Sequence, residues 1–191
     1  MPRRKLIRSK NLPYHVTARS NNKEWFQLPL LQVWKLSQES LKEAISIHPV
    51  ELINFVLMKN HYHMLLVTPE GNLDAFIYEF NKRLALKIKD QTGQINRIFG
   101  GRYKWCLIES QTYLINCYRY IYQNPVRAGL VRYCEDYKFS TLQSVLGKSL
   151  FVVALHDRYG LSSLCDLECL NESIQDDDLE VLRKKLYRCV C

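Results

Sequence analysis

The stretch LINFVLMKNHYHMLLV, residues 52–67, decides the fold. Two apolar runs, 52–58 and 61–67, flank the pair Lys59-Asn60, which predicts two strands joined by a tight hairpin. Side chains alternate along a strand with a period of two, so His61 and His63 leave the same face of the second strand. Two imidazoles on one face can bind a single divalent cation. Two partly buried structural histidines above the core are the alternative.

The rest of the chain predicts an α+β fold around this hairpin. Alternating or helically spaced apolar residues predict two more strands and three helices. The strands are expected at 14–19 and 102–108, and the helices at 30–47, 73–89 and 111–123. Pro125 is expected to stop the last helix. The order predicts a ferredoxin-like antiparallel sheet with helices on one face, plus a helical C-terminal extension.

Charge divides the chain into two parts. The net charge is +8, and the sequence pI is about 9.1. Residues 1–150 carry 22 basic and 11 acidic side chains, whereas residues 151–191 carry 5 and 8. A basic balance indicates a polyanionic partner such as nucleic acid. We expect a basic domain with a basic N-terminal arm over 1–143, and an acidic extension over 144–191.

The sequence also bears on compartment and cofactors. No apolar run approaches the roughly 18–20 residues that span a bilayer, and the basic start has no apolar signal-peptide core. A cytoplasmic protein without a membrane partner is therefore expected. The seven cysteines form no CxxC pair and have no histidine among them, so a structural zinc site is not expected.

A second candidate group lies on the helix predicted at 111–123. Tyr120 and Asn124 are four residues apart and share one side of a helix. Because Asn124 precedes Pro125, its amide is expected to reach outward from the helix end. Beside the two histidines, this amide could complete a cation site, and the cation would favour the phenolate of Tyr120. Attack by that phenolate on a phosphodiester would leave a 5′-phosphotyrosine. An ordinary amphipathic surface tyrosine is the alternative.

Four segments together resemble the REP-associated tyrosine transposases, a branch of the single-strand HUH transposases. They are YHVTAR at 14–19, VLMKNHYHML at 56–65, GRYK at 101–104 and YIYQNPVRAGLV at 120–131. The resemblance implies a ferredoxin-like catalytic domain that cleaves and joins single-stranded DNA at palindromic hairpins. It implies that His61, His63 and Asn124 bind Mg²⁺ or Mn²⁺ and that Tyr120 is the nucleophile. Relatives often carry Gln at the position of Asn124.

Basic side chains outside this set are candidate DNA contacts. An N-terminal arm could follow a phosphate backbone or be a solubilising terminus. Arg102 and Lys104, which alternate along the strand predicted at 102–108, share one face and could hold phosphates. Arg127, which follows the helix predicted at 111–123, could contact the scissile region or brace the end of that helix. The candidates are Arg3, Arg4, Lys5, Arg8, Arg102, Lys104 and Arg127.

Three other functions compete with a transposase. The same fold could grip DNA hairpins without turnover, as a regulator, but such a binder has no chemical need for a nucleophile. A relaxase or replication initiator would form the same adduct, yet those proteins are usually longer. RNA processing is compatible with the charge. A monomer and a homodimer are equally compatible with the sequence, and the role of the acidic extension is open.

Overall fold

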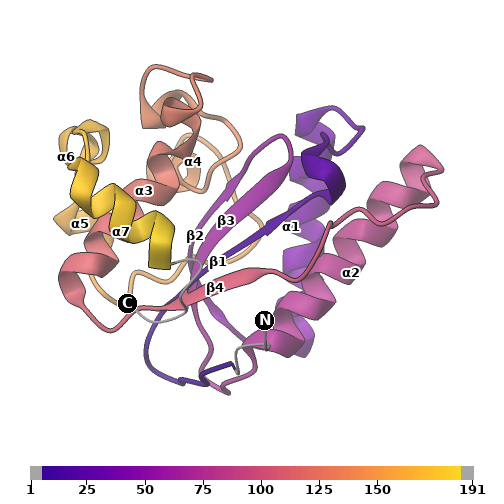
Figure 1. The fold of residues 1–191 in the computed structure, drawn as a ribbon, viewed down its shortest axis with the longest axis horizontal. Coiled ribbons are helices and arrows are strands. Elements are labelled where there is room, and N and C mark those ends of the chain that lie inside the picture. The colour runs from indigo at the N-terminus through magenta and orange to yellow at the C-terminus, as the bar shows by residue number, and fades with distance from the viewer. Residues whose placement is uncertain (1–5, 186–191) are drawn as a thin grey trace.

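The computed structural model describes residues 6–185 of the chain and has at its centre a four-stranded antiparallel sheet (Figure 1). The spatial order of the strands is β2-β3-β1-β4, and every neighbouring pair is antiparallel. Their bounds are β1 Tyr14–Arg19, β2 Glu51–Leu57, β3 His61–Val67 and β4 Lys104–Leu107. This arrangement confirms the predicted α+β, ferredoxin-like sheet.

Helices α1 (Leu30–Ile47) and α2 (Leu73–Thr92) cover one face of the sheet. The period of two in β3 sends Tyr62, Met64 and Leu66 into this layer. The apolar stripe of α2 packs there as well, because residues three and four apart share one side of a helix.

The opposite face is covered by α3 (Gln111–Arg127) and by the short C-terminal helices (Figure 1). The prediction of helices on one face therefore holds for α1 and α2 but is wrong for α3. The reason lies in β3, whose Leu65 and Val67 make its second face apolar as well. The remaining helices are η1 (Asn21–Lys23), η2 (Cys134–Asp136), α4 (Leu142–Val145), α5 (Leu161–Leu164), α6 (Leu167–Asn171) and α7 (Asp176–Lys185).

Helix α3 continues through Pro125, where the sequence predicted its end. A proline in a helix lacks the N–H that would bond the carbonyl four residues earlier, here that of Ile121. The side-chain amide of Asn124 compensates: its Nδ2 donates to the carbonyls of Tyr120 (2.8 Å) and Ile121 (3.4 Å). The extra turn places Arg127 on the helix instead of beyond it.

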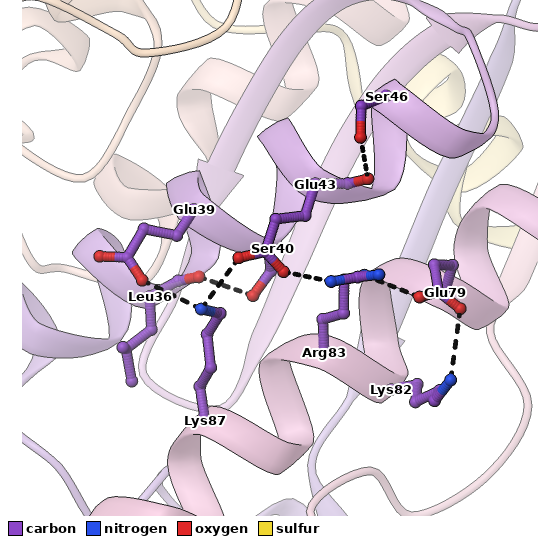
Figure 2. A network of polar contacts seen from close by, with 9 residues as sticks. All are labelled: Leu36, Glu39, Ser40, Glu43, Ser46, Glu79, Lys82, Arg83 and Lys87. Carbon is purple, nitrogen blue, oxygen red and sulfur yellow. Dashed lines mark hydrogen bonds and ion pairs between the residues drawn. The ribbon is translucent and has the colours of Figure 1, made fainter.

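An ion-pair network ties α1 to α2 (Figure 2). Arg83 contacts Glu43 on α1 and Glu79 on its own helix, and Lys87 bonds Glu39 (3.2 Å) and Glu43 (3.1 Å). Arg83, followed by Lys87, holds the pKa of the Glu43 carboxyl below its usual value. Because these side chains are partly exposed, the network supplements the apolar packing between the two helices.

Side chains of α3 donate hydrogen bonds to backbone carbonyls of the C-terminal segment and hold it against the helix. The Arg119 guanidinium donates to the carbonyls of Cys169 (2.9 Å) and Glu172 (3.0 Å), and Gln123 Nε2 donates to that of Leu170 (2.8 Å). Leu170 is 2% exposed and belongs to the apolar cluster beneath α3. The predicted division at 143/144 stays a prediction, although residues on both sides share this core. Across the described residues, no helix is long and apolar enough to cross a bilayer.

Replacing Leu170 by alanine is expected to destabilise the whole protein and not only the extension. A buried leucine truncated to alanine costs about 2–5 kcal/mol in unfolding free energy, from lost burial and a residual cavity. Urea unfolding followed by circular dichroism measures this difference. Leu167→Ala, on the same helix but 36% exposed, is the matched control and should change stability far less. Equal effects of the two substitutions would contradict the packing argument.

Candidate functional site

A cleft of 480 Å³ opens where the ends of β1 and β3 meet α3. His61, His63, Tyr120 and Asn124 all line it, although β3 and the second half of α3 lie more than fifty residues apart in the chain. The structure thus brings together the two groups that the sequence singled out separately. The other residues that line the cleft are Thr17, Ala18, Arg19, Ser20, Asn22, Lys23, Gly100, Gly101, Arg102 and Lys104.

The two histidines of β3 face the cleft side by side, with ring centroids 5.1 Å apart. Burial, with Arg19 as a smaller cause, lowers the pKa of His61 to about 4, and burial also holds that of His63 well below its usual value. Both imidazoles are therefore neutral at pH 7. Neutral imidazole is the form that binds metals.

Hydrogen bonds determine which nitrogen of His61 is available. Asn60 donates through Nδ2 to the carbonyl of Lys23 (2.6 Å), which fixes the orientation of its amide. Its Oδ1 then lies 2.7 Å from His61 Nδ1 and can only accept, so that nitrogen carries the proton. Nε2 of His61 is left with a lone pair.

A third histidine, His15 on β1, lies behind the pair and was not among the predicted site residues. Its Nε2 is 2.9 Å from His63 Nδ1, and the side chain is fully buried. This contact leaves Nε2 of His63 as the nitrogen available to a cation. Burial lowers the pKa of His15 to about 3, and its own Nδ1 has no hydrogen-bond partner. The sequence held one signal: His15, Thr17 and Arg19 alternate on a single strand face.

Tyr120 and Asn124 reach the cleft from α3. The Tyr120 ring lies 6.0 Å from that of His63 and 6.1 Å from that of His15, centroid to centroid. At 8% exposure it is not the surface tyrosine that its position in the helix alone would favour. Because the Nδ2 of Asn124 donates to helix carbonyls, its Oδ1 is the amide atom that remains to bind a ligand.

The donor set fits a divalent cation. Two neutral imidazoles and one amide oxygen suit Mn²⁺, and Mg²⁺ when phosphate and water oxygens complete the shell. Within residues 6–185, no group of three or more His, Cys, Asp or Glu side chains could hold a metal by itself. A cation in the cleft would therefore be held by the two imidazoles together with the Asn124 amide oxygen, and water or phosphate oxygens would complete its shell.

The predicted DNA contacts fall into four groups. Arg102 and Lys104 line the cleft, although β4 begins only at Lys104 and Arg102 precedes it. Arg127 lies over the Tyr120 ring, with its Cζ 5.8 Å from the centroid. Arg8 lies away from the cleft and pairs with Asp74 (2.7 Å) at the start of α2. Arg3, Arg4 and Lys5 lie outside the described residues. Arg19 and Lys23, which the sequence analysis did not select, add two cations to the cleft.

Comparison with known proteins defines first a fold and then a family. A solved structure of a REP-associated tyrosine transposase bound to a REP hairpin is similar, with a TM-score of 0.65 and 18% identity over 92% of this chain and 100% of that one. A Deinococcus radiodurans R1 protein described as a candidate transposase has a TM-score of 0.44 and 16% identity, over 63% of this chain and 94% of that one. No curated protein matches the sequence.

The sequence pattern of the family described as "Transposase IS200 like" matches residues 8–124, more than half of the chain. The protein therefore belongs to the IS200-like transposase family, whose members process DNA. Residues 8–124 include all four side chains that the sequence analysis placed at the centre of the site.

Proposed function

We propose that this transposase is a metal-dependent endonuclease and strand transferase that acts on single-stranded DNA through a 5′-phosphotyrosine intermediate. One observation carries the proposal: Tyr120, His61, His63 and Asn124 line one cleft, although they come from distant parts of the chain. A phenol beside side chains that can hold a divalent cation is an arrangement that suits covalent phosphoryl transfer.

In the proposed reaction, the Tyr120 oxygen attacks the scissile phosphorus. A bond forms between the phenolic oxygen and phosphorus, and the bond from phosphorus to the 3′ oxygen breaks. The phenol loses its proton, and the departing 3′ oxygen gains one. The phosphodiester bond energy is retained in the adduct, so a 3′ hydroxyl can reverse the step and join strands.

The residues of the cleft have separate tasks in this scheme. His61, His63 and Asn124 would hold Mg²⁺ or Mn²⁺, which when bound would neutralise charge on the attacked phosphate. Arg19 and Arg102, which also line the cleft, place further positive charge there for the DNA backbone. Arg127 lies close enough to the Tyr120 ring to position it.

A hairpin-forming single strand is the proposed substrate. The similar solved structure is that of a transposase bound to a REP hairpin. The net charge of +8 is consistent with a nucleic-acid partner. The test uses an end-labelled oligonucleotide with a palindromic hairpin from the DNA that flanks the gene. Incubation with Mn²⁺ or Mg²⁺ should give a protein–DNA adduct on a denaturing gel, and EDTA should abolish it. Tight binding without an adduct would instead favour a non-catalytic hairpin-binding regulator.

His15 is the proposed positioning residue for His63. To bind a cation through Nε2, His63 must carry its proton on Nδ1 and donate it to His15 Nε2, which lies 2.9 Å away. A hydrogen bond of this kind fixes the tautomer and the ring orientation of a metal-binding histidine. His15→Phe keeps a ring of similar shape but removes the acceptor.

His15→Phe is expected to weaken Mn²⁺ binding about 10- to 100-fold, as measured by titration calorimetry without DNA. Cys117→Ala, a substitution at a fully buried position of α3 that does not line the cleft, is the control for a loss of packing. It should lower thermal stability and leave Mn²⁺ affinity unchanged. Equal Mn²⁺ affinity in His15→Phe and wild type would exclude the positioning role.

A further inference from the structure

A second hollow, of 570 Å³, lies beside the catalytic cleft, between α2 and residues 97–103. We call it the α2 groove. Gly101 and Arg102 line both the groove and the cleft, so the two hollows are adjacent at this point. The segment that forms one wall runs back from the end of α2 to β4 (Figure 1). Hollows of this size accommodate small organic groups such as a nucleobase.

The chemistry of the α2 groove combines aromatic and basic side chains. Tyr78 is 67% exposed and Tyr103 lies on the opposite wall, while Lys89, Arg97 and Arg102 supply positive charge; Lys82 also lines the groove but pairs with Glu79 (3.6 Å). The single acidic residue of the lining, Asp74, is paired with Arg8. An exposed aromatic ring among cations is the combination that binds single-stranded nucleic acid.

A polar group at the base of the α2 groove connects it to the metal-binding strand. Asn81 accepts through Oδ1 a hydrogen bond from the hydroxyl of Tyr62 (2.8 Å), and Tyr62 stands between His61 and His63 in β3. The amide nitrogen of Asn81 is then the atom left to donate to a ligand. Nucleobase edges carry acceptors to which such an amide nitrogen can donate a hydrogen bond.

The wall of the α2 groove is held rigidly at the end of β1. Asn21 N–H donates to the carbonyl of Ile98 (2.8 Å), and Gly100 N–H donates to that of Arg19 (3.0 Å). A Cβ on Gly100 would lie 2.9 Å from the Asn21 Cα, so glycine permits this close approach. The groove is therefore formed before any ligand binds.

We infer that the α2 groove binds an unpaired nucleotide of the DNA strand, adjacent to the scissile phosphate. The inference rests on the proposed function, because it takes the occupant of the cleft to be single-stranded DNA. The strand leaves the cleft over Gly101 and Arg102, a base stacks on Tyr78, and Arg97 contacts a phosphate. The groove selects for unpaired DNA, since a base within a duplex cannot enter it.

The test places 2-aminopurine, whose fluorescence is quenched on stacking, in the unpaired ends of the flanking-DNA hairpin. Each of about five unpaired positions on either side carries the probe in turn, and EDTA prevents cleavage. Full-length wild-type protein should quench one position. Tyr78→Ala should lose that quenching and bind about tenfold more weakly, since stacking contributes about 1–3 kcal/mol per base. Leu86→Ala, also exposed on α2 but outside the groove, should behave as wild type.

A second measurement concerns the phosphate contact. Arg97→Ala should reduce the slope of log affinity against log salt by about one, whereas Lys35→Ala, exposed on α1, should not. The inference would be overturned if Tyr78→Ala quenched the probe as strongly as wild type does. It would also be overturned if Tyr78→Ala lost as much affinity for a hairpin without unpaired ends as for one that has them. If either of these two results is obtained while the wild-type protein still forms the adduct in Mn²⁺, only the assignment of the groove fails. If wild type neither binds nor cleaves the oligonucleotide, the proposed function fails as well.

Discussion

Tyr120→Phe is expected to form no covalent adduct with the hairpin oligonucleotide. The substitution removes one oxygen, and with it the atom that would bond to phosphorus, while the ring still fills its place beside His63 and His15. Loss of a nucleophile lowers turnover by on the order of 10³-fold or more. The denaturing gel in Mn²⁺ measures the adduct directly.

Tyr122→Phe is the matched control, because it removes a hydroxyl from the same helix two residues away. Tyr122 is 1% exposed, and its hydroxyl lies 3.1 Å from that of Thr141, so it cannot reach a phosphate in the cleft. This variant should lose some stability and still form the adduct. Tyr120→Phe should retain Mn²⁺ and hairpin binding. An adduct with Tyr120→Phe, or its loss with Tyr122→Phe, would contradict the assignment of the nucleophile.

His61→Ala and His63→Ala are expected to reduce Mn²⁺ affinity by about 100-fold or more and to abolish the adduct. Each removes one of the two imidazoles in the cleft, and the remaining protein donors then number only two. Titration calorimetry measures the affinity without DNA. His156→Ala, at an exposed histidine away from the cleft, should bind Mn²⁺ as wild type does.

The buried histidines also predict how Mn²⁺ binding depends on pH. Metal competes with protons for an imidazole, so affinity falls once the pH drops below the pKa of the ligand. An ordinary histidine, with a pKa near 6.5, would be mostly protonated at pH 5.5. Burial lowers the pKa of His61 to about 4, so only a few per cent is protonated there. Mn²⁺ affinity should therefore change little between pH 7.5 and 5.5. A loss near 100-fold would show that these histidines titrate as exposed ones do.

Much of the local structure followed from pattern alone. The bounds of β1 and α1 agree with the predicted 14–19 and 30–47, and those of β3 with 61–67. The prediction for β4 was too long, because the segment before Lys104 folds back along α2 and pairs with β1 only from Lys104 onward. The predicted end of α3 was wrong because an asparagine side chain replaced the hydrogen bond that Pro125 cannot make.

The candidate site, too, was predictable from the sequence only in part. The alternation of β3 predicted that His61 and His63 share a face, and the spacing in α3 predicted that Tyr120 and Asn124 share a side. That these two pairs meet in one cleft was visible only in the structure. The hydrogen bond between His63 and His15 was equally hidden, because it depends on the register between β1 and β3.

The sequence by itself thus determined the strands, the helices, the excess of basic charge and the side chains of each pair. The charge is a matter of composition, and the other properties depend on residues two to four positions apart, which backbone geometry relates directly. Only the tertiary structure decided that α3 covers the second face of the sheet, that His15 lies behind His63, and that the α2 groove opens beside the cleft. These features depend on packing between segments distant in the chain, which local periodicity does not specify.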